Sequence, residues 1–193
     1  ALMAGVAGDA ARLLHLQQIW RHDPFFLLPE VDGAIYHAWA QSIAGGDVAG
    51  EGVFIMGPLY PYLMGALYAL VGPDLLVLKA LQALLGALSC CLVWRLARDC
   101  FDARVALCAG VVAALDEMLI FYGGTVMLEN VQVPLVLAVL IGSLRALERP
   151  SAARWLGVGV GIGLSALARQ SMLLYAPLIG LWLLTSLRTR LPA

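Results

Sequence analysis

The chain has 193 residues, of which 62% are hydrophobic and only 13% are charged. Soluble domains average roughly 45–50% apolar and about 25% charged residues, so this composition excludes an ordinary soluble domain and indicates a protein of the lipid bilayer. The formal net charge of −1 gives no reason to expect a nucleic-acid partner.

A long polar segment precedes the most apolar part of the chain. The sequence starts without an initiator Met, so we interpret it as a fragment of a larger integral membrane protein. We expect residues 1–8 to be the tail of a first span and residues 9–72 to be an extracytoplasmic loop with short interfacial helices. Helical spacing over residues 32–44 places Asp32, Tyr36 and Trp39 on one face. Residues 58–71 are apolar and aromatic but short, which favours a helix in the membrane interface.

Apolar stretches of the length of membrane spans fill the rest of the chain. A hydrocarbon core of roughly 30 Å needs about 20 apolar residues in a helix. Lipid also forbids open sheet edges, so such stretches must be helical. The spans are expected near residues 75–97, 105–122, 131–147, 155–168 and 172–187. The sequence therefore predicts an all-α polytopic membrane protein, with residues 1–193 in a single transmembrane domain.

Basic residues mark one side of this topology. Eight arginines flank alternate connections or close the chain: Arg95, Arg98, Arg104, Arg145, Arg149, Arg154, Arg188 and Arg190. The positive-inside rule places these connections in the cytoplasm. The polar segment, with most of the acids, then faces the exterior.

Asp32 is the first candidate for chemistry, and two interpretations fit it. An acid near a helix N-terminus satisfies free backbone N–H groups and meets the positive end of the helix dipole. Alternatively, Asp32 is a general base at the membrane interface. The aromatic Tyr36 and Trp39 beside it would then bind a sugar ring or partly dehydrate the carboxylate. Tyr60 lies in the aromatic run from Pro58 to Tyr62 and is expected to contact substrate with them.

Glu129 and Arg169 are the other candidates. Glu129 stands at the start of a span, where it is either solvated by headgroups or faces the bundle interior as a functional group. Arg169 stands between two short helices on the outer side. It is either a snorkelling or structurally paired arginine, or a ligand for a phosphate group, which suits a planar guanidinium.

These features, in this order, resemble a family. The motifs are the acid in residues 31–36, the run 57–63, the segment 78–88, the Arg-Leu-Ala-Arg run 95–98, Glu129, and Leu-Ala-Arg at 167–169. Together they are similar to the N-terminal half of GT-C class membrane glycosyltransferases of the dolichyl-phosphate-mannose–protein mannosyltransferase and lipid A aminoarabinose transferase type. The resemblance covers nearly the whole chain and implies a GT-C-like transmembrane helix bundle.

The resemblance also implies an activity. A sugar is expected to pass, with inversion, from a polyprenyl-phosphate-linked donor to an acceptor hydroxyl on the outer face of a bacterial cytoplasmic membrane. Asp32 matches the essential acid of the family's first loop and would take the proton of the acceptor. Arg169 would correspond to an arginine near the lipid phosphate.

No metal site is expected from the first loop. Many relatives have an Asp-Glu pair where this chain has Asp32 and Gly33, and some have an acid before the Pro-Leu-Tyr run that this chain lacks. A metal, if used, would need Glu129 or residues beyond this fragment.

Two other function classes remain as alternatives. A transporter or flippase of a lipid-linked or small polar substrate would carry charges at the bilayer midplane on broken helices, whereas the polar residues here lie in a loop. A non-catalytic membrane scaffold would not require Asp32, Glu129 and Arg169 on one side.

Overall fold

The computed structural model describes residues 2–24, 26–29, 31–49 and 56–188. The described residues form helices and no strand, which confirms the expected all-α fold. The helices are α1 (Leu2–His22), α2 (Asp32–Ala44), α3 (Leu59–Val71), α4 (Leu75–Cys100), α5 (Ala103–Leu115), α6 (Glu117–Gly123), α7 (Glu129–Glu148), α8 (Ala152–Ala168), the 3-10 turn η1 (Gln170–Leu174) and α9 (Tyr175–Arg188).

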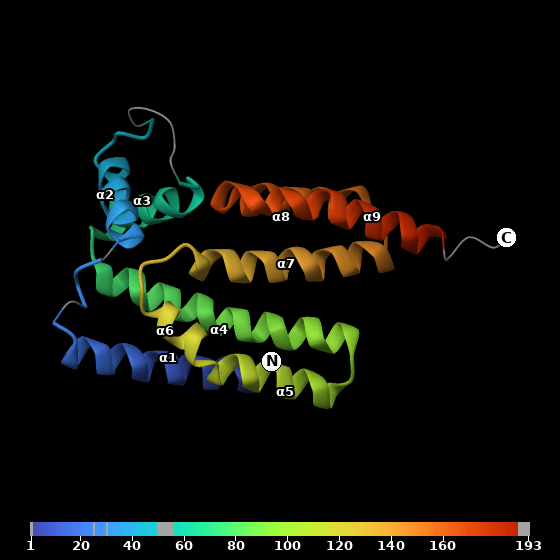
Figure 1. Cartoon of the computed structure of the whole chain (residues 1–193), viewed down its shortest axis with the longest axis horizontal. Coiled ribbons are helices and arrows are strands. Elements are labelled where there is room, and N and C mark those ends of the chain that lie inside the picture. The colour runs from blue at the N-terminus through green and yellow to red at the C-terminus, as the bar shows by residue number, and fades with distance from the viewer. Residues whose placement is uncertain (1, 25, 30, 50–55, 189–193) are drawn as a thin grey trace.

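The long helices lie side by side in one bundle (Figure 1). Helix α4 is central: it packs against α1, α5 and α7, and α7 packs in turn against α8. Helices α4 and α7 are long and apolar enough to cross a membrane, and α5 with α6 would add a third span if the bent pair is one. The helix ends with Arg98, Arg145 and Arg154 gather at one end of the bundle, and α2 and α3 cover the other end.

Helix α1 differs from the expected extracytoplasmic loop of residues 9–72. It continues to His22 and packs against α4 and α5, so the irregular segment starts only at Asp23. The polar residues in the middle of this helix divide between two of its faces. Gln17 and Gln18 are exposed, whereas Arg12 is 2% exposed and donates from Nη1 to the Gly8 carbonyl oxygen at 3.1 Å. Helical packing thus buries the charged Arg12 side chain inside the bundle.

The expected span of residues 105–122 is broken. Helix α5 ends at Leu115, and α6 begins at Glu117 after a bend of 50°. Asp116 has an extended backbone and its carboxylate accepts the Leu119 N–H at 2.9 Å, which makes it the N-cap of α6. An N-cap satisfies backbone donors that a continuous helix would use internally, so Asp116 stabilises the break.

Helices α2 and α3 form a pair across the end of the bundle (Figure 1). Their shared core contains Tyr36, Ala40, Tyr60, Met64 and Tyr68, and it continues onto the first turns of α4 and the segment between α6 and α7. A Cβ on Gly65 would lie 2.7 Å from Ile43, so glycine permits the close approach of the two helices. This pair fixes the position of the first residue of α2, Asp32.

Candidate functional site

A cleft of about 430 Å³ lies where α1, α2, α4 and the segment joining α6 to α7 meet. Its ionisable lining residues are His15, Asp23, Asp32 and Lys79. Asp32 therefore borders a concave site and does not lie on an open loop. The site combines carboxylates and a cation with an apolar wall, which is the usual character of a small-molecule site.

Asp32 is held in this cleft by close backbone packing. It is half-buried at the first turn of α2, and its neighbour Gly33 lies against the segment between α6 and α7. A Cβ at Gly33 would be 2.9 Å from the Val126 carbonyl oxygen and 3.2 Å from Val126 Cβ. The structure thus gives a physical reason for the glycine that follows Asp32, because a second acid there would collide with this segment.

The residue before Asp32 has an unusual backbone. Val31 has φ 47° and ψ −118°, which a β-branched residue rarely adopts. Strained residues of this kind cluster at functional sites, where the surrounding structure holds them. Val31 also lines the cleft, so the strain lies directly at the site.

Lys79 supplies the cation of the cleft, although no role was assigned to it from the sequence. Its side chain is 7% exposed, its Nζ donates to the Phe26 carbonyl oxygen at 2.6 Å, and Nζ lies 3.9 Å from the centroid of the Phe26 ring. These contacts attach the segment between α1 and α2 to α4. A lysine inside an otherwise apolar span was the available signal, because ionisable residues within spans are costly and usually functional.

Gln82, one turn further along α4, supports the opposite wall. It is 1% exposed. Its Oε1 accepts the Tyr60 hydroxyl, and its Nε2 donates to the Thr125 carbonyl oxygen at 2.7 Å and to the Gly123 carbonyl oxygen at 3.4 Å. Asn130 Nδ2 lies within hydrogen-bonding distance of the Tyr122 carbonyl oxygen of α6, at 3.0 Å, and of the Thr125 and Met127 carbonyl oxygens of the following segment, each at 3.2 Å. The side-chain amides of Gln82 and Asn130 thereby fix the wall that faces Asp32.

The aromatic residues expected at the site pack mainly on one another. Tyr36 and Tyr60 are 3% and 2% exposed, and their rings meet edge to face with centroids 5.1 Å apart. Trp39 meets Tyr62 in the same manner at 6.2 Å and stays partly exposed. None of the three expected aromatics, Tyr36, Trp39 or Tyr60, lines the cleft with Asp32. Tyr36 and Trp39 of α2 thus pack on Tyr60 and Tyr62 of α3, and these contacts hold the two helices together.

Glu129 and Arg169 form an ion pair outside the Asp32 cleft. Arg169 Nη2 lies 2.6 Å from Glu129 Oε1, with side chains that are 51% and 38% exposed. Arg169 ends α8 and Glu129 lies in the first turn of α7, so the pair joins two helices. The structure brings these two predicted residues together, but neither lines the cleft that holds Asp32.

Asp32 and the Glu129–Arg169 ion pair both affect the pKa of Tyr36. Burial raises the pKa of its hydroxyl, the Asp32 and Glu129 carboxylates raise this pKa further, and Arg169 lowers it. Charges influence a pKa in this way only at short range, so Asp32 and the ion pair both lie near Tyr36. Tyr36 is the structural link between them.

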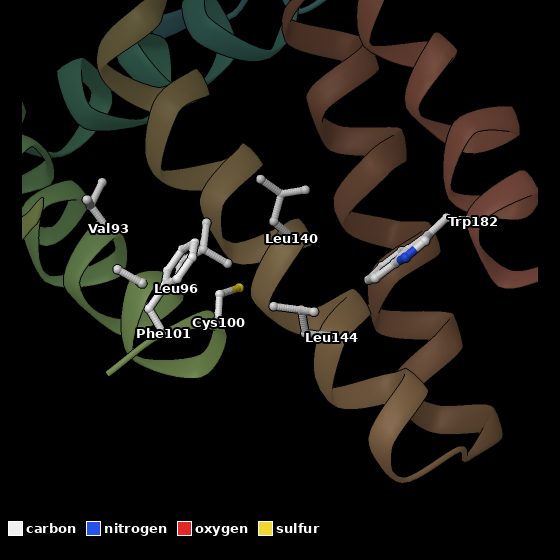
Figure 2. A pocket seen from close by; sticks show the side chains of 8 residues that line it. Val93, Leu96, Cys100, Phe101, Leu140, Leu144 and Trp182 are labelled. Carbon is white, nitrogen blue, oxygen red and sulfur yellow. The ribbon is translucent and has the colours of Figure 1, made fainter. Parts of the chain in front are cut away.

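A second hollow, of about 420 Å³, lies near the arginine end of the bundle (Figure 2). Figure 2 shows Cys100 and Phe101 at the end of α4 on one side, Trp182 on the other, and Leu140 and Leu144 of α7 between them. Its lining has no charged side chain, so it offers no acid, base or phosphate ligand. Over the part of the chain that the structure describes, no three His, Cys, Asp or Glu side chains are grouped as a metal site would require.

Comparison with known proteins identifies the family. The family model described as dolichyl-phosphate-mannose-protein mannosyltransferase matches residues 56–192. The chain belongs to this mannosyltransferase family. The searches of curated proteins and of solved structures returned no match.

The match has a direct bearing on the site. It includes Tyr60, Lys79, Gln82, Glu129 and Arg169, and begins after the segment that holds Asp32. Membership of the mannosyltransferase family, together with the apolar helices, makes the protein an integral membrane glycosyltransferase, and the family suggests a lipid-linked sugar donor. This supports the enzyme interpretation over a transporter, flippase or scaffold.

Proposed function

We propose that the protein transfers a sugar from a polyprenyl-phosphate-linked donor to an acceptor hydroxyl, with Asp32 as the general base. The observation that carries this proposal is the cleft that Asp32 shares with the Lys79 cation. A carboxylate suits proton removal from the acceptor, and a cation suits the phosphate of the donor. The family match adds a mannosyltransferase as the type of enzyme.

The reaction needs one proton acceptor and one stabiliser of negative charge. The acceptor oxygen forms a bond to the anomeric carbon while the bond from that carbon to the phosphate oxygen breaks. The electron pair leaves with the lipid phosphate, and the hydroxyl proton passes to the Asp32 carboxylate. Lys79 offsets the charge that develops on the phosphate, because an ammonium group acts as a compact positive charge.

Arg169 is the second candidate for the phosphate. It already binds Glu129 at 2.6 Å and lies outside the cleft lining, so Lys79 is the better-placed cation. We assign to the Glu129–Arg169 pair the positioning of α7 and α8 beside Tyr36. Trp39, which is partly exposed, is the aromatic residue that a substrate reaches most easily, whereas the buried Tyr36 and Tyr60 join α2 to α3.

The proposed location follows from the two ends of the bundle. The cleft lies at the end opposite the arginine-rich connections, which the positive-inside rule assigns to the cytoplasm. The enzyme is therefore proposed to act on the outer face of a bacterial cytoplasmic membrane. No role for a resident metal is part of this mechanism.

The test is an Asp32→Asn substitution in the intact enzyme, in membranes that contain its native acceptors. Transfer of labelled mannose from polyprenyl-phosphate mannose should fall by about 10²- to 10⁴-fold, the usual contribution of a general base. The control is Asp47→Asn, which changes an exposed carboxylate outside the cleft and should leave the rate close to that of the wild type. An Asp32→Asn enzyme that unfolds at the wild-type temperature and keeps its transfer rate would remove Asp32 from the mechanism.

A further inference from the structure

An open groove runs between α7 and α8, away from the Asp32 cleft. It has a volume of about 330 Å³, and its ends are marked by Leu135 and Gly161 near the middle of the helices and by Arg145 and Arg154 at the arginine end. Apart from the two arginines, its lining consists of leucine, valine, alanine and glycine. The groove is thus apolar along its length and cationic at one end.

The two arginines have no carboxylate partner within the described ranges. Both side chains are exposed, and the bond of Arg154 Nη1 goes to the Arg149 carbonyl oxygen. Arg145 lies in the last turn of α7, where the helix dipole favours a cation. Arg154 lies in the first turn of α8, where the dipole disfavours one, so helix stability does not explain its position. The two cations and the N-terminus of α8 give this end of the groove a strong preference for an anion.

The length of the groove matches one leaflet. Its lining on α7 extends from Leu135 to Arg145, and ten residues at about 1.5 Å per residue give about 15 Å. This is half of the roughly 30 Å hydrocarbon core of a bilayer. The charged end therefore falls at the depth of the headgroups when the apolar end lies near the midplane.

We propose that this groove binds an anionic phospholipid. The lipid phosphate lies between Arg145 and Arg154, and one acyl chain lies along the apolar wall. Basic pockets between transmembrane helices bind anionic headgroups in this way. A further helix packed on the small residues of α8 would fill the apolar part as well. It would leave both guanidinium groups without an anion, and charge complementarity therefore favours the lipid.

Glycine makes room for the acyl chain. An added Cβ at Gly157 meets no atom within 4 Å, so the space over this residue is empty and faces the groove. Gly161, by contrast, lies against Val139, with 2.6 Å from its added Cβ to that side chain. The groove is open because only part of the glycine-rich face of α8 packs on α7. The bound lipid would fix α7 and α8 at the ends opposite Glu129 and Arg169.

The experiment uses the full-length protein in phosphatidylcholine vesicles with a minor share of phosphatidylglycerol that carries a photoreactive acyl chain. After irradiation, labelled peptides are quantified by mass spectrometry. Label should attach to the groove segments of α7 and α8, and unlabelled phosphatidylglycerol should compete for it. Arg145→Gln and Arg154→Gln should each lower the labelling by about fivefold, and the double variant by about 25-fold.

Matched controls separate this site from general membrane contact. Gly157→Leu fills the groove and should abolish the labelling, whereas Gly159→Leu, which also has no atom within 4 Å of an added Cβ but does not line the groove, should leave it unchanged. Arg98→Gln removes an exposed arginine at the same end of the bundle and should also have no effect. Equal labelling by a phosphatidylcholine probe, or labelling that persists in the double arginine variant, would overturn the proposal. The proposal would also be overturned if the groove carries no label because another helix covers it. None of these outcomes depends on glycosyl transfer, so failure of the proposed activity would be seen separately.

Discussion

Gly57 offers the sharpest test of how the site end of the protein is packed. A Cβ at Gly57 would lie 1.9 Å from the Ala168 carbonyl oxygen and 2.7 Å from the Leu167 carbonyl oxygen. Real Cβ contacts below 3.0 Å essentially do not occur, so Gly57→Ala must separate the two backbones by at least 1.1 Å, the difference between 3.0 and 1.9 Å. Both partners are backbone, and no flexible side chain can move to relieve the collision.

The expected cost is at the upper end of that for overpacking, about 2–3 kcal/mol. For a chain of this size we expect the midpoint of thermal unfolding to fall by roughly 4–12 °C, at about 2–4 °C per kcal/mol. The same displacement at Arg169 would open its 2.6 Å contact with Glu129 beyond hydrogen-bonding distance.

The assay is thermal unfolding of the purified protein in detergent, with Gly159→Ala as the control. Gly159 is also a glycine of α8, and no atom lies within 4 Å of its added Cβ. Alanine there should be neutral or stabilising, because it is the better helix former by about 1 kcal/mol. If Gly57→Ala unfolds at the wild-type temperature, the close contact between Gly57 and the end of α8 does not exist in the protein.

Two further predictions concern buried polar groups. Gln82→Leu removes the acceptor of the buried Tyr60 hydroxyl, whereas the Thr125 carbonyl oxygen keeps its bond from Asn130, so the substitution should cost about 1–3 kcal/mol in thermal unfolding. Gln132→Leu is its matched control, because the amide atoms of this buried glutamine have no hydrogen-bond partner among the described residues, and its removal should not destabilise the protein. Burial lowers the pKa of His37, whose Nδ1 lies 2.8 Å from the Tyr68 hydroxyl. The folded protein therefore prefers neutral His37. Neutral His37 therefore contributes fully to the stability of the folded state above the ordinary pKa of 6.5. This contribution is lost as the pH falls below that value, because the unfolded chain then binds a proton that the folded protein disfavours. The midpoint of thermal unfolding, measured across roughly pH 5 to 8, should fall towards acid pH, and His37→Asn should make this fall shallower. An unchanged pH dependence in His37→Asn would contradict the role assigned to His37.

Several properties of the protein follow from its sequence alone. The content of 62% hydrophobic and 13% charged residues requires a membrane environment, and lipid then requires helices, because only a helix satisfies its own backbone hydrogen bonds. The alternation of arginine-rich connections determines which helix ends lie together. Local patterns also marked Asp32 as the first turn of a helix, which is where the structure has it.

The sequence could not determine which polar groups meet. Lys79 and Gln82 lie on adjacent turns of the apolar helix α4. Only the packing of α1 and α3 on α4 shows that Lys79 borders the Asp32 cleft and that Gln82 binds the Tyr60 hydroxyl. The pairing of Glu129 with Arg169 links residues 40 positions apart. Such contacts depend on the register of neighbouring helices, which hydrophobic periodicity does not specify.

Helix α1 is the clearest example of a contact between distant residues that the sequence could not determine. The sequence indicated an extracytoplasmic loop from residue 9, because the positive-inside rule places this polar segment outside the cytoplasm. The tertiary structure buries the Arg12 side chain beside Gly86, where an added Cβ would lie 2.4 Å from the arginine Nε. A glycine on one helix thus makes space for a long polar side chain on another. Composition determines that this protein is a helical membrane protein, whereas the fit between distant residues determines where its site lies.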